Sequence, residues 1–145
     1  SLGGLYQFAF LRLYPDEVAA VVLIDPTPPD HWRSLQREHP DLALLMKGVR
    51  LTLFSQTDRE EFDAQAQCLD GLPPPDGRVI PTVLLASGQR RPEEQAMVPM
   101  LERLRQDWLR LIPGARLQIV HDAGHYIQKE RPQRVADALR ALQRQ

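Results

Sequence analysis

The stretch VAAVVLID, residues 18–25, is an apolar run that ends in an aspartate. It lacks the alternation of apolar and polar residues that a strand with one wet face would have. A continuous run of this kind is typical of a strand covered on both faces, as in a parallel sheet. VIPTVLLAS (79–87) and ARLQIV (115–120) predict two further strands. The three stretches together indicate a parallel sheet buried between helices.

Helical patterns separate these strands. Apolar residues three and four apart predict a helix from about Val98, which Pro113 and Gly114 end, and Pro132 can begin a last amphipathic helix. The charged residues of ERLRQDWLR, 102–110, are predicted to form the exposed face of the first of these two helices. Strands and helices that alternate along the chain define the α/β fold class.

The first helix is predicted over residues 4–14, and apolar or aromatic side chains cover nearly its whole circumference. A helix that is apolar all round is predicted to be buried on all sides. Because no strand precedes it in the sequence, we expect the N-terminal strands of the sheet to lie upstream. Without them, residues 1–145 alone are expected to be inactive and poorly stable.

Composition excludes several classes of partner. Eighteen basic and nineteen acidic residues give a net charge of −1, which argues against a nucleic acid or an anionic membrane. No stretch has the length and hydrophobicity of a membrane span. The single cysteine, Cys68, cannot form an internal disulfide. No metal-ligand spacing and no phosphate loop are present, so we expect neither a metal nor another cofactor.

Three chemically useful side chains fall where a parallel sheet collects its active groups, beyond the carboxyl ends of its strands. Ser1 precedes the first helix, Asp25 follows the first strand, and His125 follows the last strand. A histidine can take the proton of a serine hydroxyl during attack, and a carboxylate can orient the imidazole.

The segment SLGG, residues 1–4, resembles the right half of the G-x-S-x-G nucleophile elbow of the α/β-hydrolase superfamily. VVLIDPTPPDHW, PTVLLASG and DAGHYIQKERPQRVADAL resemble later segments of the same family. The resemblance covers the whole chain but only the C-terminal half of the fold. It implies that residues 1–27 form the elbow helix and a core strand, that residues 28–78 form a helical lid insert, and that residues 79–145 complete the core.

The resemblance also implies roles for the site residues. Ser1 would be the nucleophile, His125 the general base, and the backbone N–H of Leu2 one donor of the oxyanion hole. Glycines are expected beside the serine because a Cβ there would collide with neighbouring chain. The missing N-terminal half would supply the second oxyanion donor, and no cofactor is required.

The acid of this arrangement has more than one candidate. Most family members carry an aspartate shortly after the penultimate strand, but this sequence has SGQRRPEE there. Asp25 is favoured because it lies directly at a strand end, where some members keep the acid. Glu93 and Glu94 are the alternatives.

The function expected from the resemblance is that of a serine hydrolase, which cleaves an ester or a related acyl bond through an acyl-enzyme. Its partner would be a small-molecule substrate, and the leucines of the insert indicate an apolar acyl portion. Two alternatives remain. One is a non-catalytic hydrolase-like binding protein, and the other is a hydrolase in which the α-amine of Ser1 serves as the base. The second alternative belongs to a fold with antiparallel sheets, which these strands do not resemble.

Overall fold

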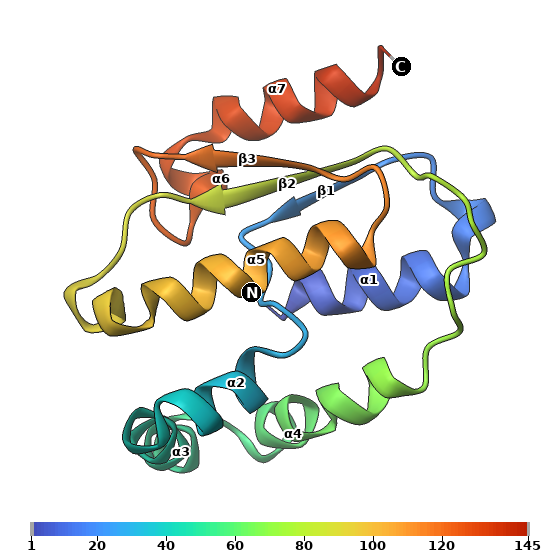
Figure 1. Ribbon diagram of the computed structural model, residues 1–145. Helices are drawn as coiled ribbons and strands as arrows, with labels where there is room; N and C mark the ends of the chain where they lie inside the picture. Colours follow the sequence, from blue (N-terminus) through green and yellow to red (C-terminus); the bar gives the residue numbers. More distant parts are fainter. Residues whose placement is uncertain (1, 145) are drawn as a thin grey trace.

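The computed structural model describes residues 2–144, apart from the side chains of residues 65–68 and 93. Its elements in chain order are α1 (Gly3–Leu13), η1 (Pro15–Glu17), β1 (Val21–Ile24), α2 (His31–Glu38), α3 (Pro40–Leu53), α4 (Gln56–Asp70), β2 (Thr82–Ser87), η2 (Pro92–Met97), α5 (Val98–Leu111), β3 (Arg116–Val120), α6 (Ile127–Glu130) and α7 (Pro132–Leu142). Figure 1 shows their arrangement.

The three strands form one parallel sheet in the order β1-β2-β3. Leu84 of β2 pairs with Leu23 on one side and with Leu117 on the other. Every residue of β2 is buried, because this strand lies between two others and is covered by helices on both faces. The predicted strands and their parallel arrangement are confirmed. The burial predicted for the whole sheet holds only for β2, because most of β1 is half-buried and Ile119 of β3 is 45% exposed.

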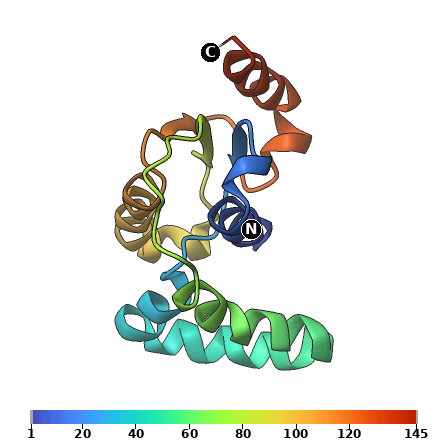
Figure 2. The same ribbon diagram turned by 90° about the vertical axis from the view of Figure 1, so that its right-hand side faces the viewer.

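Helices cover the two faces of the sheet in separate layers. α1 and α5 lie on one face, and α6 and α7 lie on the other (Figures 1 and 2). Alternation along β2 divides its side chains between the two layers. Leu84 packs with Phe8 and Trp108 in one apolar cluster, whereas Val83 and Leu85 pack in the other.

The first helix differs from its prediction. Leu5, Phe8 and Leu11 are buried, but the side chains of Tyr6 and Leu13 are 54% and 51% exposed. The described sheet contacts only one side of α1, and the side chains on the opposite side stay partly exposed, although the Tyr6 hydroxyl donates to Glu61 of α4 at 2.9 Å. The prediction of a helix buried on all sides is therefore wrong for this structure.

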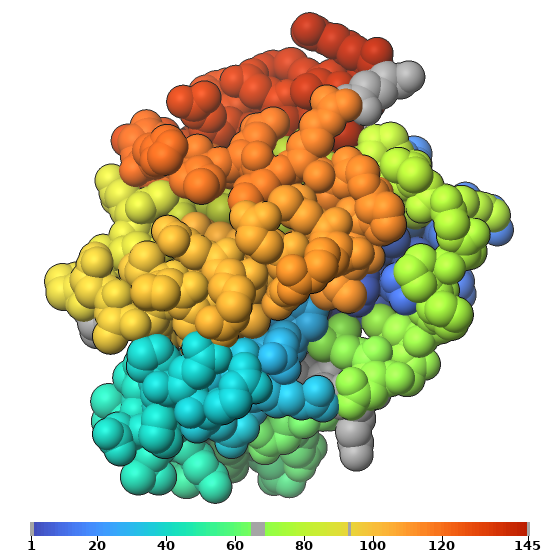
Figure 3. Space-filling view, viewed as in Figure 1, coloured from blue at the N-terminus to red at the C-terminus, as the bar shows by residue number. Residues whose placement is uncertain are grey.

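Three helices, α2 to α4, fill the segment between β1 and β2. They lie below α1 and α5 in Figure 1, and Figure 3 shows the surface of α2 and α3 meeting that of η2 and α5. An apolar cluster joins the two parts, with Leu35 and Ala43 on the insert and Met97, Met100 and Leu104 on η2 and α5. None of the described helices has the length and apolar character needed to cross a membrane.

Candidate active site

The end of β1 places Asp25 beside the end of β2. The backbone N–H of Asp25 donates to the carbonyl of Leu85 at 2.7 Å, and its φ of +39° lies in the left-handed region. Few residues other than glycine adopt this conformation, although aspartate tolerates it better than most. The turn ends the strand and directs the carboxylate toward Ser87.

Three groups hold the Asp25 carboxylate. The backbone N–H of Ser87 donates to Oδ1 at 2.9 Å, and the Ser87 hydroxyl lies 3.0 Å from both carboxylate oxygens. Nδ1 of His125 lies 2.8 Å from Oδ2. A guanidinium nitrogen of Arg105 lies 3.8 Å from Oδ1. The carboxylate is thus surrounded by donors and positive charge.

These contacts keep Asp25 ionised and set which nitrogen of His125 faces it. Burial raises the pKa of Asp25, but the hydrogen bonds from His125 and Ser87 outweigh it and hold the pKa below its usual value. The carboxylate is therefore ionised at neutral pH and can only accept. Nδ1 of His125 consequently donates to it, and in the neutral ring Nε2 keeps its lone pair.

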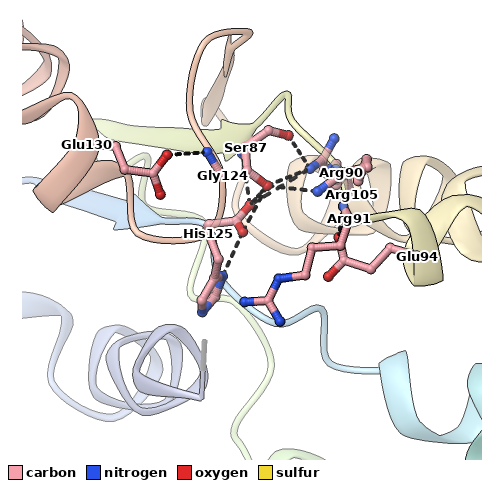
Figure 4. A network of polar contacts seen from close by, with 9 residues as sticks. Ser87, Arg90, Arg91, Glu94, Arg105, Gly124, His125 and Glu130 are labelled. Atoms are coloured by element: carbon pink, nitrogen blue, oxygen red, sulfur yellow. Dashed lines mark hydrogen bonds and ion pairs between the residues drawn. The ribbon is translucent and has the colours of Figure 1, made fainter.

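Two arginines support Ser87 from the other side. A guanidinium nitrogen of Arg90 donates to the Ser87 hydroxyl at 2.7 Å, and one of Arg105 donates to the Ser87 carbonyl at 2.7 Å. Figure 4 shows both side chains converging on Ser87. The side chain of Ser87 is buried, so each of these polar contacts is made largely out of water.

The loop after β3 holds His125 in place. The backbone N–H of Gly124 donates to the carboxylate of Glu130 at 2.8 Å, which ties this loop to α6 (Figure 4). The backbone N–H of Gly88 donates to Val120 and Ala123, which ties the loop after β2 to the same segment. A Cβ at Gly88 would lie 2.5 Å from the Cα of His121, so this close approach requires glycine.

Two cavities meet at the pair formed by Asp25 and His125. The polar cavity has a volume of about 250 Å³. Besides Asp25 and His125, its lining includes Gln89, Arg91 and Tyr126. The insert cavity has a volume of about 190 Å³ and lies between the sheet and the helical insert. Besides Asp25 and His125, its lining combines apolar residues of both parts with polar or charged ones: Pro26, Pro28, Met46, Met97 and Leu101, and Thr27, His31, Arg90, Glu94 and Arg105. Among the described residues, no cluster of side chains could hold a metal ion.

The structure describes some of the predicted site residues but not all of them. Ser1 lies outside the described residues. Leu2 directly precedes α1, and a Cβ added at Gly4 would lie 2.4 Å from the Cβ of Pro26. The start of α1 therefore lies against the segment that follows Asp25. A Cβ at Gly3 would meet nothing within 4 Å, so the collision expected beside the serine falls on Gly4.

The geometry also distinguishes between the candidate acids. Of the described candidates, Asp25 contacts the His125 ring. Glu94 lines both cavities, but its carboxylate accepts a hydrogen bond from the backbone N–H of Arg91 at 3.1 Å, at the start of η2. The side chain of Glu93 lies outside the described residues.

Sequence reasoning missed Ser87, Arg90, Arg105 and His31. Ser87 is signalled by its place as the last residue of a buried strand, where active groups collect. Arg105 belongs to the segment predicted to be an exposed face, but its side chain is only 13% exposed. That part of the prediction is wrong because the Ser87 carbonyl gives this guanidinium a partner inside the protein.

The parallel sheet agrees with the fold of an alpha/beta hydrolase, as do its flanking helices and the pair formed by Asp25 and His125 at the strand ends. The model of the alpha/beta hydrolase family matches residues 1–138, and the chain belongs to that family. The predicted superfamily and fold class are confirmed.

One solved structure also resembles this chain, with a TM-score of 0.50 and 20% sequence identity. It is described as Est816, an N-acyl homoserine lactone degrading enzyme. The match covers 97% of this chain and 64% of that chain, so residues 1–145 span under two thirds of its length. At this identity the likeness bears on the fold alone. The search of curated proteins returned no match.

Proposed function

We propose that the protein is a serine hydrolase that cleaves an ester or a related acyl bond through an acyl-enzyme. The observation that carries the proposal is the 2.8 Å contact between Nδ1 of His125 and Asp25 at the carboxyl ends of parallel strands, in a member of the alpha/beta hydrolase family. Ser1 is the proposed nucleophile, His125 the general base and Asp25 the acid.

In the proposed reaction, Nε2 of His125 takes the proton of the Ser1 hydroxyl as its oxygen attacks the acyl carbon. Asp25 stabilises the imidazolium without taking its proton. The imidazolium then protonates the leaving alcohol, and the acyl–oxygen bond breaks to give the acyl-enzyme. Water attacks this ester with the same base, which releases the acid and restores the serine.

The oxyanion that forms in each step needs donors already in place. We assign one of them to the backbone N–H of Leu2, because the positive end of the α1 dipole adds to it. The contact of Gly4 with Pro26 supports this assignment, since it holds the start of α1 beside the loop that carries Asp25.

The acyl portion of the substrate is proposed to occupy the insert cavity. Met46, Met97 and Leu101 give it an apolar lining, and the same cavity reaches His125. An acyl chain placed there would lie between the sheet and the insert, with its carbonyl close to the imidazole. This arrangement gives residues 28–78 the role of a lid that forms part of the pocket.

A fluorophosphonate probe tests the proposal in the full-length protein. We expect covalent labelling at Ser1, loss of labelling in Ser1→Ala and strong reduction in His125→Ala. Ser55→Ala is the matched control, because Ser55 is an exposed serine that contacts Asp58 at the start of α4. A folded protein whose Ser1 stays unlabelled would reject the proposal in favour of a non-catalytic binding protein.

A further inference from the structure

His31 is the first residue of α2, where the helical insert begins. Its side chain lines the insert cavity, which also contains Asp25 and His125. The residue is half-buried, and its backbone N–H donates to the carbonyl of Pro28 at 3.0 Å. The main chain of His31 is thus held at the helix start, while its imidazole borders the cavity.

The imidazole has no hydrogen-bond partner among the described residues. Burial lowers the pKa of His31, so the ring is neutral at neutral pH and offers one donor and one acceptor. The wall of this cavity combines the apolar Met46, Met97 and Leu101 with the charged Arg90, Glu94 and Arg105. The residue is only half-buried, and the cavity that it borders is the place where a polar group of a ligand would meet the ring.

We propose that His31 binds the substrate, through a hydrogen bond to an oxygen on its acyl chain. The inference rests on the proposed hydrolase function and names the substrate class: esters whose acyl chain carries a hydroxyl or keto oxygen near the scissile carbonyl. The oxygen lies near that carbonyl because one cavity of about 190 Å³ holds both His31 and His125. The apolar wall takes the remaining hydrocarbon.

The test compares methyl hexanoate with methyl 3-hydroxyhexanoate, which differ by one hydroxyl group. The full-length protein is assayed with each ester as wild type, His31→Phe and His31→Gln. We expect wild type to prefer the hydroxy ester, and His31→Phe to lower the ratio of the two kcat/KM values about tenfold, mainly through KM. His31→Gln keeps a donor and an acceptor and should restore much of that ratio.

His39→Phe is the matched control. His39 directly follows the last residue of α2 and lies outside the lining of both cavities. The same change of imidazole to phenyl should leave the ratio unaltered there. Circular dichroism checks that each variant folds, and His31→Ala replaces His31→Phe if the latter does not.

A binding measurement separates this inference from the proposed function. Isothermal titration of the Ser1→Ala protein with each ester measures discrimination without turnover. One outcome is that the protein binds the two esters with different affinities, that this difference depends on His31, and that wild type cleaves neither ester. This outcome would support the inference and reject the hydrolase. Cleavage or binding with a ratio insensitive to His31→Phe would overturn the inference and leave the hydrolase intact. Binding of neither ester would also overturn it.

Discussion

His125 donates from Nδ1 to the carboxylate of Asp25 at 2.8 Å, although 100 positions of the sequence separate the two residues. They belong to the loops after β3 and β1, the outer strands of the sheet, and Ser87 at the end of β2 lies between those strands. Parallel strands end at the same edge of a sheet, so residues far apart in the chain meet there.

Replacement of Asp25 by asparagine should lower kcat by roughly 10³–10⁴-fold, because an amide can donate to Nδ1 and so favour the wrong tautomer of His125. Hydrolysis of an activated ester by the full-length protein measures the change. Asp122→Asn is the control, since Asp122 pairs with Arg131 at 2.6 Å, and its activity should match wild type. An Asp25→Asn protein within tenfold of wild type would point to another carboxylate, such as Glu94.

The lowered pKa of Asp25 predicts a pH dependence of stability. An aspartate in the unfolded chain titrates at about pH 3.9, and the pKa of Asp25 in the folded protein lies below its ordinary value. The unfolded state therefore binds the proton first as pH falls, and the stabilisation present above about pH 5 is lost as pH drops through the folded pKa. The difference in unfolding free energy between wild type and Asp25→Asn, from urea titrations, should shrink from pH 7 to pH 3. A constant difference would contradict this.

Ser87→Ala removes a hydroxyl that contacts Asp25 and leaves Arg90 without its acceptor at 2.7 Å. We expect about a tenfold fall in kcat/KM, because the carboxylate loses part of its support. Thr82→Val is the control, since it also removes a buried hydroxyl bond from β2, to Ile80 at 2.9 Å, but at the other end of the strand. Both changes should lower stability by about 1 kcal/mol. Equal activities in the two variants would show that Ser87 has only a structural role.

The pattern of apolar residues predicted the strands, because a strand covered by helices on both faces needs apolar residues at successive positions. It could not predict how much of α1 is buried, since that depends on which neighbours are present. Arg105 shows a related limit. Helical spacing marks an arginine as exposed, but its partner, the Ser87 carbonyl, lies 18 positions earlier at the end of a strand. Only the folded chain brings the two together.

The candidate site, like the fold, could be predicted from the sequence only in part. Strand ends identified Asp25 and His125, because the position of an active group in a parallel sheet follows from topology. The sequence left Asp25, Glu93 and Glu94 as possible acids, since spacing along the chain does not give distances between loops. His31 carried no signal at all, because its proposed role comes from a cavity that forms only when the insert meets the core.

Gly4→Ala should destabilise the protein by about 1–3 kcal/mol, because the new Cβ would lie 2.4 Å from the Cβ of Pro26 and force the start of α1 away. Gly48→Ala is the matched control on α3, where a Cβ meets nothing within 4 Å. It should stabilise the protein by about 0.5–1 kcal/mol through helix propensity. Thermal unfolding of both variants measures the two effects, and a neutral Gly4→Ala would mean that the contact with Pro26 is not maintained.

The helical insert is held together by Arg50 of α3. Its guanidinium carbon lies 3.8 Å from the ring centre of Phe62 on α4 and 5.0 Å from that of Trp32 on α2. One of its nitrogens contacts Asp63 at 2.5 Å, and the Arg50 side chain is only 7% exposed. A planar cation packed against two rings, largely out of water, stabilises more than an exposed ion pair does.

Arg50→Lys keeps the charge but loses the planar face, and should cost about 1–2 kcal/mol. Because all four groups belong to the insert, the loss should be local, with hydrogen exchange in α2 to α4 about tenfold faster and little change in the strands. Arg59→Lys is the control, since Arg59 donates to the carbonyl of Leu51 on the surface at 3.1 Å. Equal acceleration in the insert and the sheet would contradict this, because it would mean that the two unfold as one unit.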